Sequence, residues 1–311
     1  MRVLSIDGGG IRGILPARVL AELEKLGKRP IAQQFDLLAG TSSGAILALA
    51  LSLSDTAGRP RYTAAELYDF YLAHGQDLFP GPSLPRRLVR LAEPGRANDA
   101  RRLLAECFGD ARFGDAQPQV IVPTFDLERA VPLLLRSDEF AGHSRPKTSD
   151  VALASCAAPT HLPPVEIELG SRVWFLAHGG LTANNPALFA FAAALSRADP
   201  NEVVVLSLGT GARPSRGQTG RYYRQLRRWP LSTTKSFGAH MDISSEAQHQ
   251  MLDAMLTVTG RRDRYWRIQT ALDPPANRAQ TSDTAATLAA LAGEMVDAHQ
   301  GELEAVSEVL A

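Results

Sequence analysis

The Gly-Thr-Ser-Ser-Gly stretch at residues 40–44 constrains the fold of this chain more than any other. It follows a run that predicts a buried strand, residues 35–39, and precedes one that predicts a buried helix, residues 45–51. A Gly-x-Ser-x-Gly sequence between strand and helix indicates a sharp turn that holds its serine at the end of a sheet. The N-terminal end of the helix would favour an anion forming beside Ser42. The motif alone is a weak signal, because small residues cluster in many tight turns.

A second glycine-rich stretch, Asp-Gly-Gly-Gly-Ile-Arg-Gly, occupies residues 7–13. It lies between a predicted strand at residues 3–6 and a helix predicted from about Leu15. Consecutive glycines there expose backbone N–H groups that form an anion cradle. The Gly-Lys-Ser/Thr of a Walker loop is absent, and a dinucleotide loop requires a different glycine spacing. The alternatives left are an oxyanion hole facing Ser42 and a merely tight turn.

These two motifs and three later ones resemble, in their order, the patatin-like phospholipase family. The later ones are Ala-Ala-Pro-Thr at residues 157–160, Gly-Gly-Leu-Thr-Ala-Asn-Asn-Pro at 179–186 and Leu-Ser-Leu-Gly-Thr-Gly at 206–211. The likeness covers roughly residues 1–211. It implies a three-layer α/β/α fold with a central, mostly parallel sheet. It also implies a lipid acyl hydrolase of the phospholipase or lysophospholipase type, with a Ser–Asp dyad in place of a triad.

By this resemblance Ser42 is the nucleophile, and the glycine-rich loop forms the oxyanion hole. The residues implied for that hole are Gly8, Gly9, Gly10, Arg12 and Gly13. No metal or other cofactor is expected, because no His, Cys, Asp and Glu cluster in the sequence has ligand spacing. Residues 1–211 are expected to form the catalytic core, with residues 212–311 packed on the same domain.

The aspartate of the family's dyad does not map onto this sequence. An Asp-Gly-Gly or Asp-Gly-Ala motif belongs at the end of a strand, but residues 176–180 read Leu-Ala-His-Gly-Gly, so His178 stands in its place. A neutral imidazole suits proton abstraction from Ser42 near pH 7. Alternatively the site is impaired, through a natural or engineered change, and the chain is a ligand sensor or scaffold. A histidine in a turn unrelated to the site is the third alternative.

Asp126 is the main alternative carboxylate for a displaced dyad. It lies between two stretches that predict paired strands, residues 120–125 and 131–135. A residue between paired strands is more simply explained as part of their turn.

Several helix boundaries can also be predicted. Thr63 and Glu66 form a capping box at the start of a helix. Ser149 or Asp150 is expected to cap a helix over residues 151–158, and Gly301 to break the last helix of the chain.

Charge and hydropathy exclude some classes of function. Lys plus Arg number 33, as do Asp plus Glu, so a nucleic-acid polymer is not an expected partner. The two cysteines form no metal or disulfide pattern and fit a reducing compartment. No apolar run approaches about 18 residues, and no signal peptide is recognised. The chain is therefore expected in the cytoplasm, with peripheral contact to a membrane.

Two arginine-rich stretches, residues 80–97 and 213–229, could contact phosphates or a membrane surface, or could be ordinary solvated segments. The Tyr-Trp-Arg-Ile-Gln stretch at residues 265–269, followed by an alanine-rich acidic helix, is similar to bacterial patatin-like proteins. Some of these are antiphage effectors that a cyclic dinucleotide activates. That resemblance implies a phospholipid substrate at the inner membrane, a cyclic dinucleotide activator and a homo-oligomer on activation.

Overall fold

A computed structural model of the 311-residue chain describes residues 1–79, 94–140, 145–158, 162–169, 172–212, 233–272 and 284–311. Most of the two arginine-rich stretches, residues 80–93 and 213–229, lies outside these ranges, so their contacts with phosphates or lipid stay predictions. Within the described ranges, no helix combines the length and the apolar character needed to cross a membrane.

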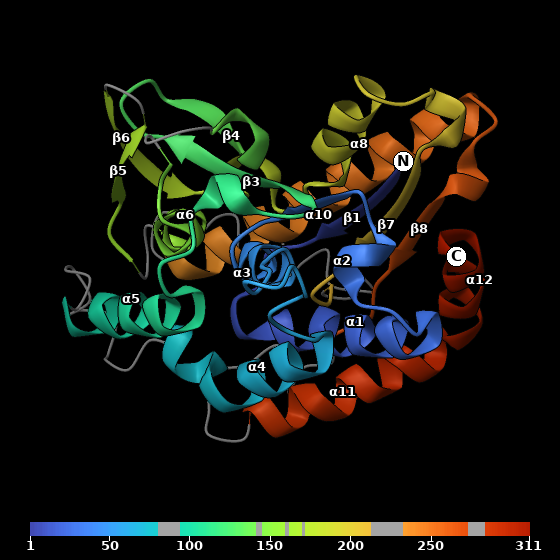
Figure 1. The fold of residues 1–311 in the computed structure, drawn as a ribbon, viewed down its shortest axis with the longest axis horizontal. Helices are drawn as coiled ribbons and strands as arrows, with labels where there is room; N and C mark the ends of the chain where they lie inside the picture. Colours follow the sequence, from blue (N-terminus) through green and yellow to red (C-terminus); the bar gives the residue numbers. More distant parts are fainter. Residues whose placement is uncertain (80–93, 141–144, 159–161, 170–171, 213–232, 273–283) are drawn as a thin grey trace, which may run out of the picture.

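An eight-stranded sheet runs through the molecule in the order β5-β6-β3-β2-β1-β7-β8, with β4 paired to β3 beside this path (Figure 1). Strands β3, β2, β1, β7 and β8 are parallel, whereas β4 and β6 run antiparallel to β3 and β5 runs antiparallel to β6. The strands are β1 (Arg2–Ile6), β2 (Leu37–Gly40), β3 (Gln119–Asp126), β4 (Val131–Arg136), β5 (Val165–Leu169), β6 (Arg172–His178), β7 (Val204–Leu208) and β8 (Tyr265–Ile268). The predicted pairing around Asp126 is confirmed as the β3–β4 hairpin.

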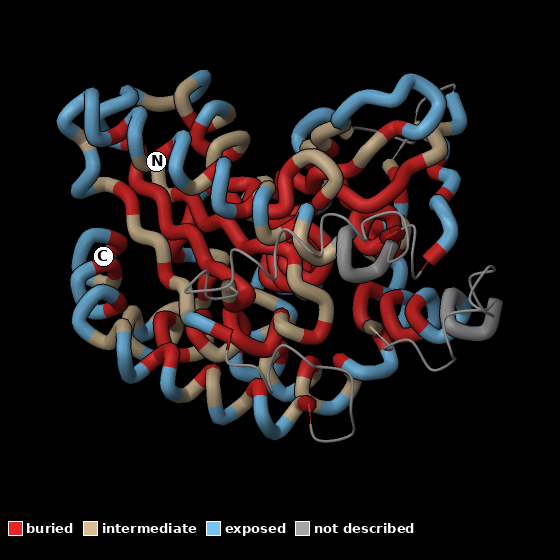
Figure 2. Tube along the Cα trace, turned by 180° about the vertical axis from the view of Figure 1, so that it is seen from behind, coloured by how far each residue is buried: buried red, intermediate tan, exposed pale blue. Residues whose placement is uncertain are grey.

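Helices cover both faces of the sheet, which confirms the predicted three-layer α/β/α architecture. Along β1, Leu4 and Ile6 pack into a core shared with α1 (Ile14–Gly27), α3 (Ser43–Leu51), α4 (Ala64–Leu78) and α11 (Thr284–Ala298). Val3 packs into a second core, shared with α8 (Ala187–Leu195) and α10 (Thr233–Val258). Successive strand residues point to opposite faces, so the parallel strands β1, β2, β3, β7 and β8 contribute to both cores. Figure 2 shows the strands as buried and the outer sides of many helices as exposed.

The remaining helices are short or peripheral. These helices are α2 (Ile31–Gln34), α5 (Pro94–Phe108), α6 (Thr148–Cys156), α7 (Gly180–Ala183) and α12 (Gln300–Leu310).

Of the predicted helix boundaries, one is confirmed and two are wrong. The capping box of Thr63 and Glu66 is confirmed at the start of α4. Helix α6, however, begins after Lys147, so Ser149 and Asp150 lie inside its first turn. The break between α11 and α12 falls at His299, whose imidazole Nε2 contacts the carbonyl oxygen of Gln269 at 3.0 Å, and not at Gly301.

Strand β8 lies beside β7 in the same sheet, so residues beyond 211 contribute to the central layer. The division of the chain at residue 211 stays a prediction. The parallel strands β1, β2 and β7 bring three segments to one edge of the sheet, because the carboxyl ends of parallel strands meet at the same edge. The glycine-rich loop after β1 and the serine turn after β2 therefore become neighbours.

Candidate active site

Ser42 occupies the sharp turn between β2 and α3. Its φ of 54° and ψ of −119° lie in a region of backbone conformation that residues other than glycine rarely adopt. A Cβ atom at Gly40 would lie 2.1 Å from the carbonyl oxygen of Gly44, and a Cβ at Gly44 would lie 2.3 Å from that of Ile6. The turn can be this tight only because both flanking residues are glycines. It holds Ser42 at the N-terminal end of α3, where the dipole of the helix favours negative charge.

Ser155, on α6, supports this turn. Its hydroxyl accepts a hydrogen bond from the backbone N–H of Ser42 at 2.9 Å and donates one to the carbonyl oxygen of Pro123 at 3.0 Å. Both hydrogen bonds are buried, and Ser155 has no exposed surface. One side chain therefore links the serine turn to β3.

The hydroxyl of Ser42 points to Sγ of Cys156, which lies 3.8 Å away. Among the described residues, it makes no hydrogen bond to the imidazole of His178. Burial raises the pKa of the Cys156 thiol to about 12, although the contact with Ser42 opposes the shift. The thiol is therefore protonated near neutral pH and is a poor nucleophile. Ser42 remains the candidate nucleophile of this site.

His178 ends β6, opposite Thr124 of β3, and is 5% exposed. Its Nδ1 accepts a hydrogen bond from the backbone N–H of Gly180 at 3.0 Å. A ring nitrogen that accepts an N–H must present its lone pair to it, so the neutral imidazole carries its proton on Nε2. In this tautomer Nε2 is a donor and cannot take a proton from Ser42.

The end of α6 also holds the backbone at His178. The N–H of His178 donates to the carbonyl oxygen of Ala157 at 3.0 Å, and that of Gly179 donates to the carbonyl oxygen of Ser155 at 3.4 Å. The same segment therefore contacts the serine turn and the strand end that carries His178. Sequence reasoning missed Ser155, although the small residues that precede the Ala-Ala-Pro-Thr motif were a signal for close packing.

The glycine-rich loop presents its N–H groups unequally. The N–H of Gly8 donates to the carbonyl oxygen of Asn184 at 2.9 Å, and that of Gly9 donates to Oγ of Ser43 at 3.0 Å. Gly10, with a positive φ of 60°, begins a 3₁₀ turn, and its N–H has no acceptor among the described residues. The same holds for the N–H of Ser43 at the start of α3. Within the described part of the chain, neither N–H makes a hydrogen bond that an anion would have to break.

Arg12 and Gly13 support the loop. The guanidinium of Arg12 donates to the carbonyl oxygens of Gly9 at 3.3 Å and Gly211 at 3.0 Å, and lies 3.9 Å from the carboxylate of Asp242 on α10. A Cβ atom at Gly13 would lie 2.5 Å from the ring of Tyr71. Arg12 thus ties the loop to the turn after β7, and Gly13 makes room for a buried aromatic ring.

The prediction that Asp126 is a turn residue is wrong in detail, because Asp126 is the last residue of β3 and its carboxylate binds the turn that follows. Its carboxylate accepts hydrogen bonds from the backbone N–H of Glu128 at 3.0 Å and from the side chain of Arg129 at 2.7 Å. Burial raises the pKa of Asp126, but the hydrogen bonds from Arg129 and from the backbone outweigh it and lower the pKa. The β3–β4 turn uses this carboxylate, and His178 stays the predicted base.

Comparisons with known proteins show which family and which proteins this chain is similar to. The family model "Patatin-like phospholipase" matches residues 4–191. Patatin-like protein 2 of Arabidopsis thaliana is 31% identical over 307 residues, covering 86% of this chain and 75% of that protein. A cGAMP-activated phospholipase of Pseudomonas aeruginosa is 34% identical over 262 residues, covering 82% and 74%. The crystal structure of VipD from Legionella pneumophila aligns with a TM-score of 0.44 and 13% identity, over 96% of this chain and 67% of that one.

Proposed function

Because this chain belongs to the patatin-like phospholipase family, we propose that it is a lipid acyl hydrolase with Ser42 as nucleophile and with slow turnover as long as His178 occupies the position of the base. Oγ of Ser42 attacks the ester carbonyl, and the alcohol leaves with the proton of the serine. Water then hydrolyses the acyl-serine to a fatty acid and restores the hydroxyl. The oxyanion that forms in each step accepts hydrogen bonds from the N–H groups of Gly10 and Ser43.

One observation supports slow turnover: the hydrogen bond from the N–H of Gly180 to Nδ1 of His178. A carboxylate has two oxygens, so it can accept this hydrogen bond with one and the proton of Ser42 with the other. A neutral imidazole has one lone pair, and Gly180 uses it. General-base assistance contributes roughly 10²–10⁴ in rate. Without it, the reaction at Ser42 is slower by this factor.

Labelling by a fluorophosphonate probe tests the proposal, since the probe reacts only with an activated serine. We expect the protein with His178 to label slowly and the His178→Asp variant to label faster. Adding Ser42→Ala to either protein should abolish labelling. Fast labelling of the chain as written that is lost in His178→Asp would instead identify the imidazole as the base. Absence of Ser42-dependent labelling in both would favour a sensor or scaffold.

The relative described as a cGAMP-activated phospholipase supports a second proposal, that a cyclic dinucleotide activates this chain. In this form the protein is an antiphage effector that assembles into a homo-oligomer and degrades phospholipid at the inner membrane. Adding cGAMP is then expected to raise Ser42-dependent labelling and the sedimentation coefficient together. Binding of cGAMP without a change in either quantity would contradict activation, and so would the absence of binding.

A further inference from the structure

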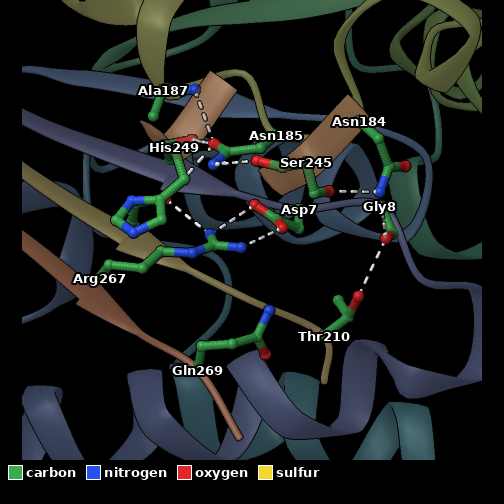
Figure 3. A network of polar contacts seen from close by, with 12 residues as sticks. Asp7, Gly8, Asn184, Asn185, Ala187, Thr210, Ser245, His249, Arg267 and Gln269 are labelled. Atoms are coloured by element: carbon green, nitrogen blue, oxygen red, sulfur yellow. Dashed lines mark hydrogen bonds and ion pairs between the residues drawn. The ribbon is translucent and has the colours of Figure 1, made fainter. Parts of the chain in front are cut away.

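A buried ion pair joins the glycine-rich loop to the C-terminal part of the chain (Figure 3). The guanidinium of Arg267, on β8, donates to both carboxylate oxygens of Asp7, at 2.8 and 2.6 Å. The Asp7 and Arg267 side chains are 2% and 9% exposed. Such a bidentate pair is strong and fixes the relative orientation of its two groups. Arg267 lies beyond residues 4–191, where the family model ends.

Asp7 lies three residues before Gly10, whose N–H is one of the two groups proposed to bind the oxyanion. Asp7 follows β1 and precedes Gly8, and both the N–H and the carbonyl oxygen of Gly8 are hydrogen-bonded. Its N–H donates to Asn184, and its carbonyl oxygen accepts from Asn184 Nδ2 at 3.1 Å and from Thr210 Oγ1 at 2.9 Å. These contacts of Gly8 are made with uncharged groups. The carboxylate of Asp7 is the one negative charge in residues 7–13, and its sign opposes an oxyanion.

Arg267 compensates that charge. Its Nη1 also donates to Oγ of Ser207 on β7 at 2.8 Å. Burial and the charge of Arg267 both lower the pKa of the neighbouring His249, so this imidazole adds no positive charge near neutral pH. The titratable groups that surround the pair are Glu246 and His249 on α10 and Tyr265 on β8. Without Arg267, a buried carboxylate would stand unpaired beside the loop.

We propose that Arg267 is a positioning residue for the reaction, which holds the glycine-rich loop through Asp7 and cancels the charge that would repel the oxyanion. The inference rests on the proposed function and extends it, because it makes a strand outside the matched family region part of the site. Arg267 thus has a structural role, which is to hold the loop, and an electrostatic role, which is to cancel the charge of Asp7. The two roles are tested separately below.

Hydrogen–deuterium exchange of the chain as written tests the loop without any need for activity. Arg267→Gln is expected to speed exchange of the N–H groups at residues 7–13, and Asp7→Asn combined with Arg267→Gln to slow it again. Removal of both charges leaves two neutral amides that can pair, so the double variant also addresses failure of the single variant to fold. If the double variant exchanges as fast as Arg267→Gln, the charge of Asp7 has no part in the effect and the proposal is overturned.

Fluorophosphonate labelling in the His178→Asp background tests the electrostatic role. Loss of a single oxyanion donor costs about 10²–10³ in rate, and Arg267→Gln is expected to approach this loss. Adding Asp7→Asn should recover most of it, which a purely structural role for Arg267 does not predict. Arg264→Gln is the matched control, since Arg264 lies three residues away in an exposed contact with Asp263. It should leave both exchange and labelling unchanged.

The two proposals fail in different ways. If the His178→Asp reference shows no Ser42-dependent labelling, the proposed function is wrong, and the exchange experiment still decides the role of Arg267. If the reference labels and Arg267→Gln labels at the same rate, the proposed function stands and the role of Arg267 is refuted.

Discussion

The backbone N–H of Gly180 donates a hydrogen bond to Nδ1 of His178 at 3.0 Å. The hydrogen bond is local, between residues two positions apart, and it places the proton of the neutral imidazole on Nε2. In the proposed function, His178 therefore accepts the N–H of Gly180 and has no second lone pair for the proton of Ser42.

His178→Asn tests this interpretation most directly. The amide oxygen of asparagine can accept the N–H of Gly180, and its NH₂ group is a donor where Nε2–H was. We therefore expect fluorophosphonate labelling at the rate of the chain as written, whereas His178→Asp should exceed both by about 10²–10⁴. Slower labelling of His178→Asn than of the chain as written would mean that the imidazole acts as a base.

Ser155→Ala is expected to weaken both the fold and the site. The substitution leaves the N–H of Ser42 and the carbonyl oxygen of Pro123 buried without their partner, at a cost of about 1–3 kcal/mol in the free energy of unfolding. Urea unfolding measures this loss, and labelling should slow because the serine turn is no longer held. The matched control is Ser196→Ala, whose exposed hydroxyl donates to the carbonyl oxygen of Ala193 and should change stability by less than about 0.5 kcal/mol. Equal effects of the two substitutions would contradict the role of Ser155.

Two Gly→Ala substitutions should have opposite effects on stability. At Gly44 the added Cβ would lie 2.3 Å from the carbonyl oxygen of Ile6, so we expect a loss of about 1–3 kcal/mol. At Gly293, inside α11, the added Cβ meets no described atom within 4 Å beyond its neighbours and the nearby backbone of its own helix. The lower entropy of the unfolded chain should then stabilise the protein by about 0.5–1 kcal/mol. Midpoints of urea unfolding compare the two, and a stable Gly44→Ala variant would contradict the tight turn.

Both cysteines should resist alkylation in the folded protein. Burial raises the pKa of Cys107 to about 11 and that of Cys156 to about 12, so at pH 8 nearly all of each thiol is in the unreactive protonated form. Iodoacetamide at pH 8 should add no mass to the native chain and two carboxamidomethyl groups after denaturation. Pretreatment should also leave labelling of Ser42 unchanged. Rapid modification of Cys156 in the native chain would show that the buried surroundings of Ser42 open to solvent.

Local patterns predicted much of the fold and the sharp turn that carries Ser42. The apolar runs on either side of residues 40–44 predicted β2 and α3, and the glycines predicted the sharp turn at Ser42, because each signal depends only on neighbours in the chain. The capping box of Thr63 and Glu66 held for the same reason. The break before α12 was misplaced by two residues, since a contact between His299 and Gln269 accompanies it and no local pattern records that contact.

The sequence by itself predicted Ser42 as the nucleophile and residues 7–13 as the loop opposite it, and it shows His178 where the resemblance implies an aspartate. Tertiary structure alone decided how these residues are supported. Ser42 depends on Ser155, 113 positions away, and Asp7 on Arg267, 260 positions away. The orientation of the His178 imidazole also depends on the tertiary structure. A sequence does not distinguish Nδ1 from Nε2, and only the groups around the ring show which nitrogen accepts a hydrogen bond. Partners so distant in sequence meet only when the parallel sheet has formed, because its strand order brings β1, β2, β7 and β8 side by side.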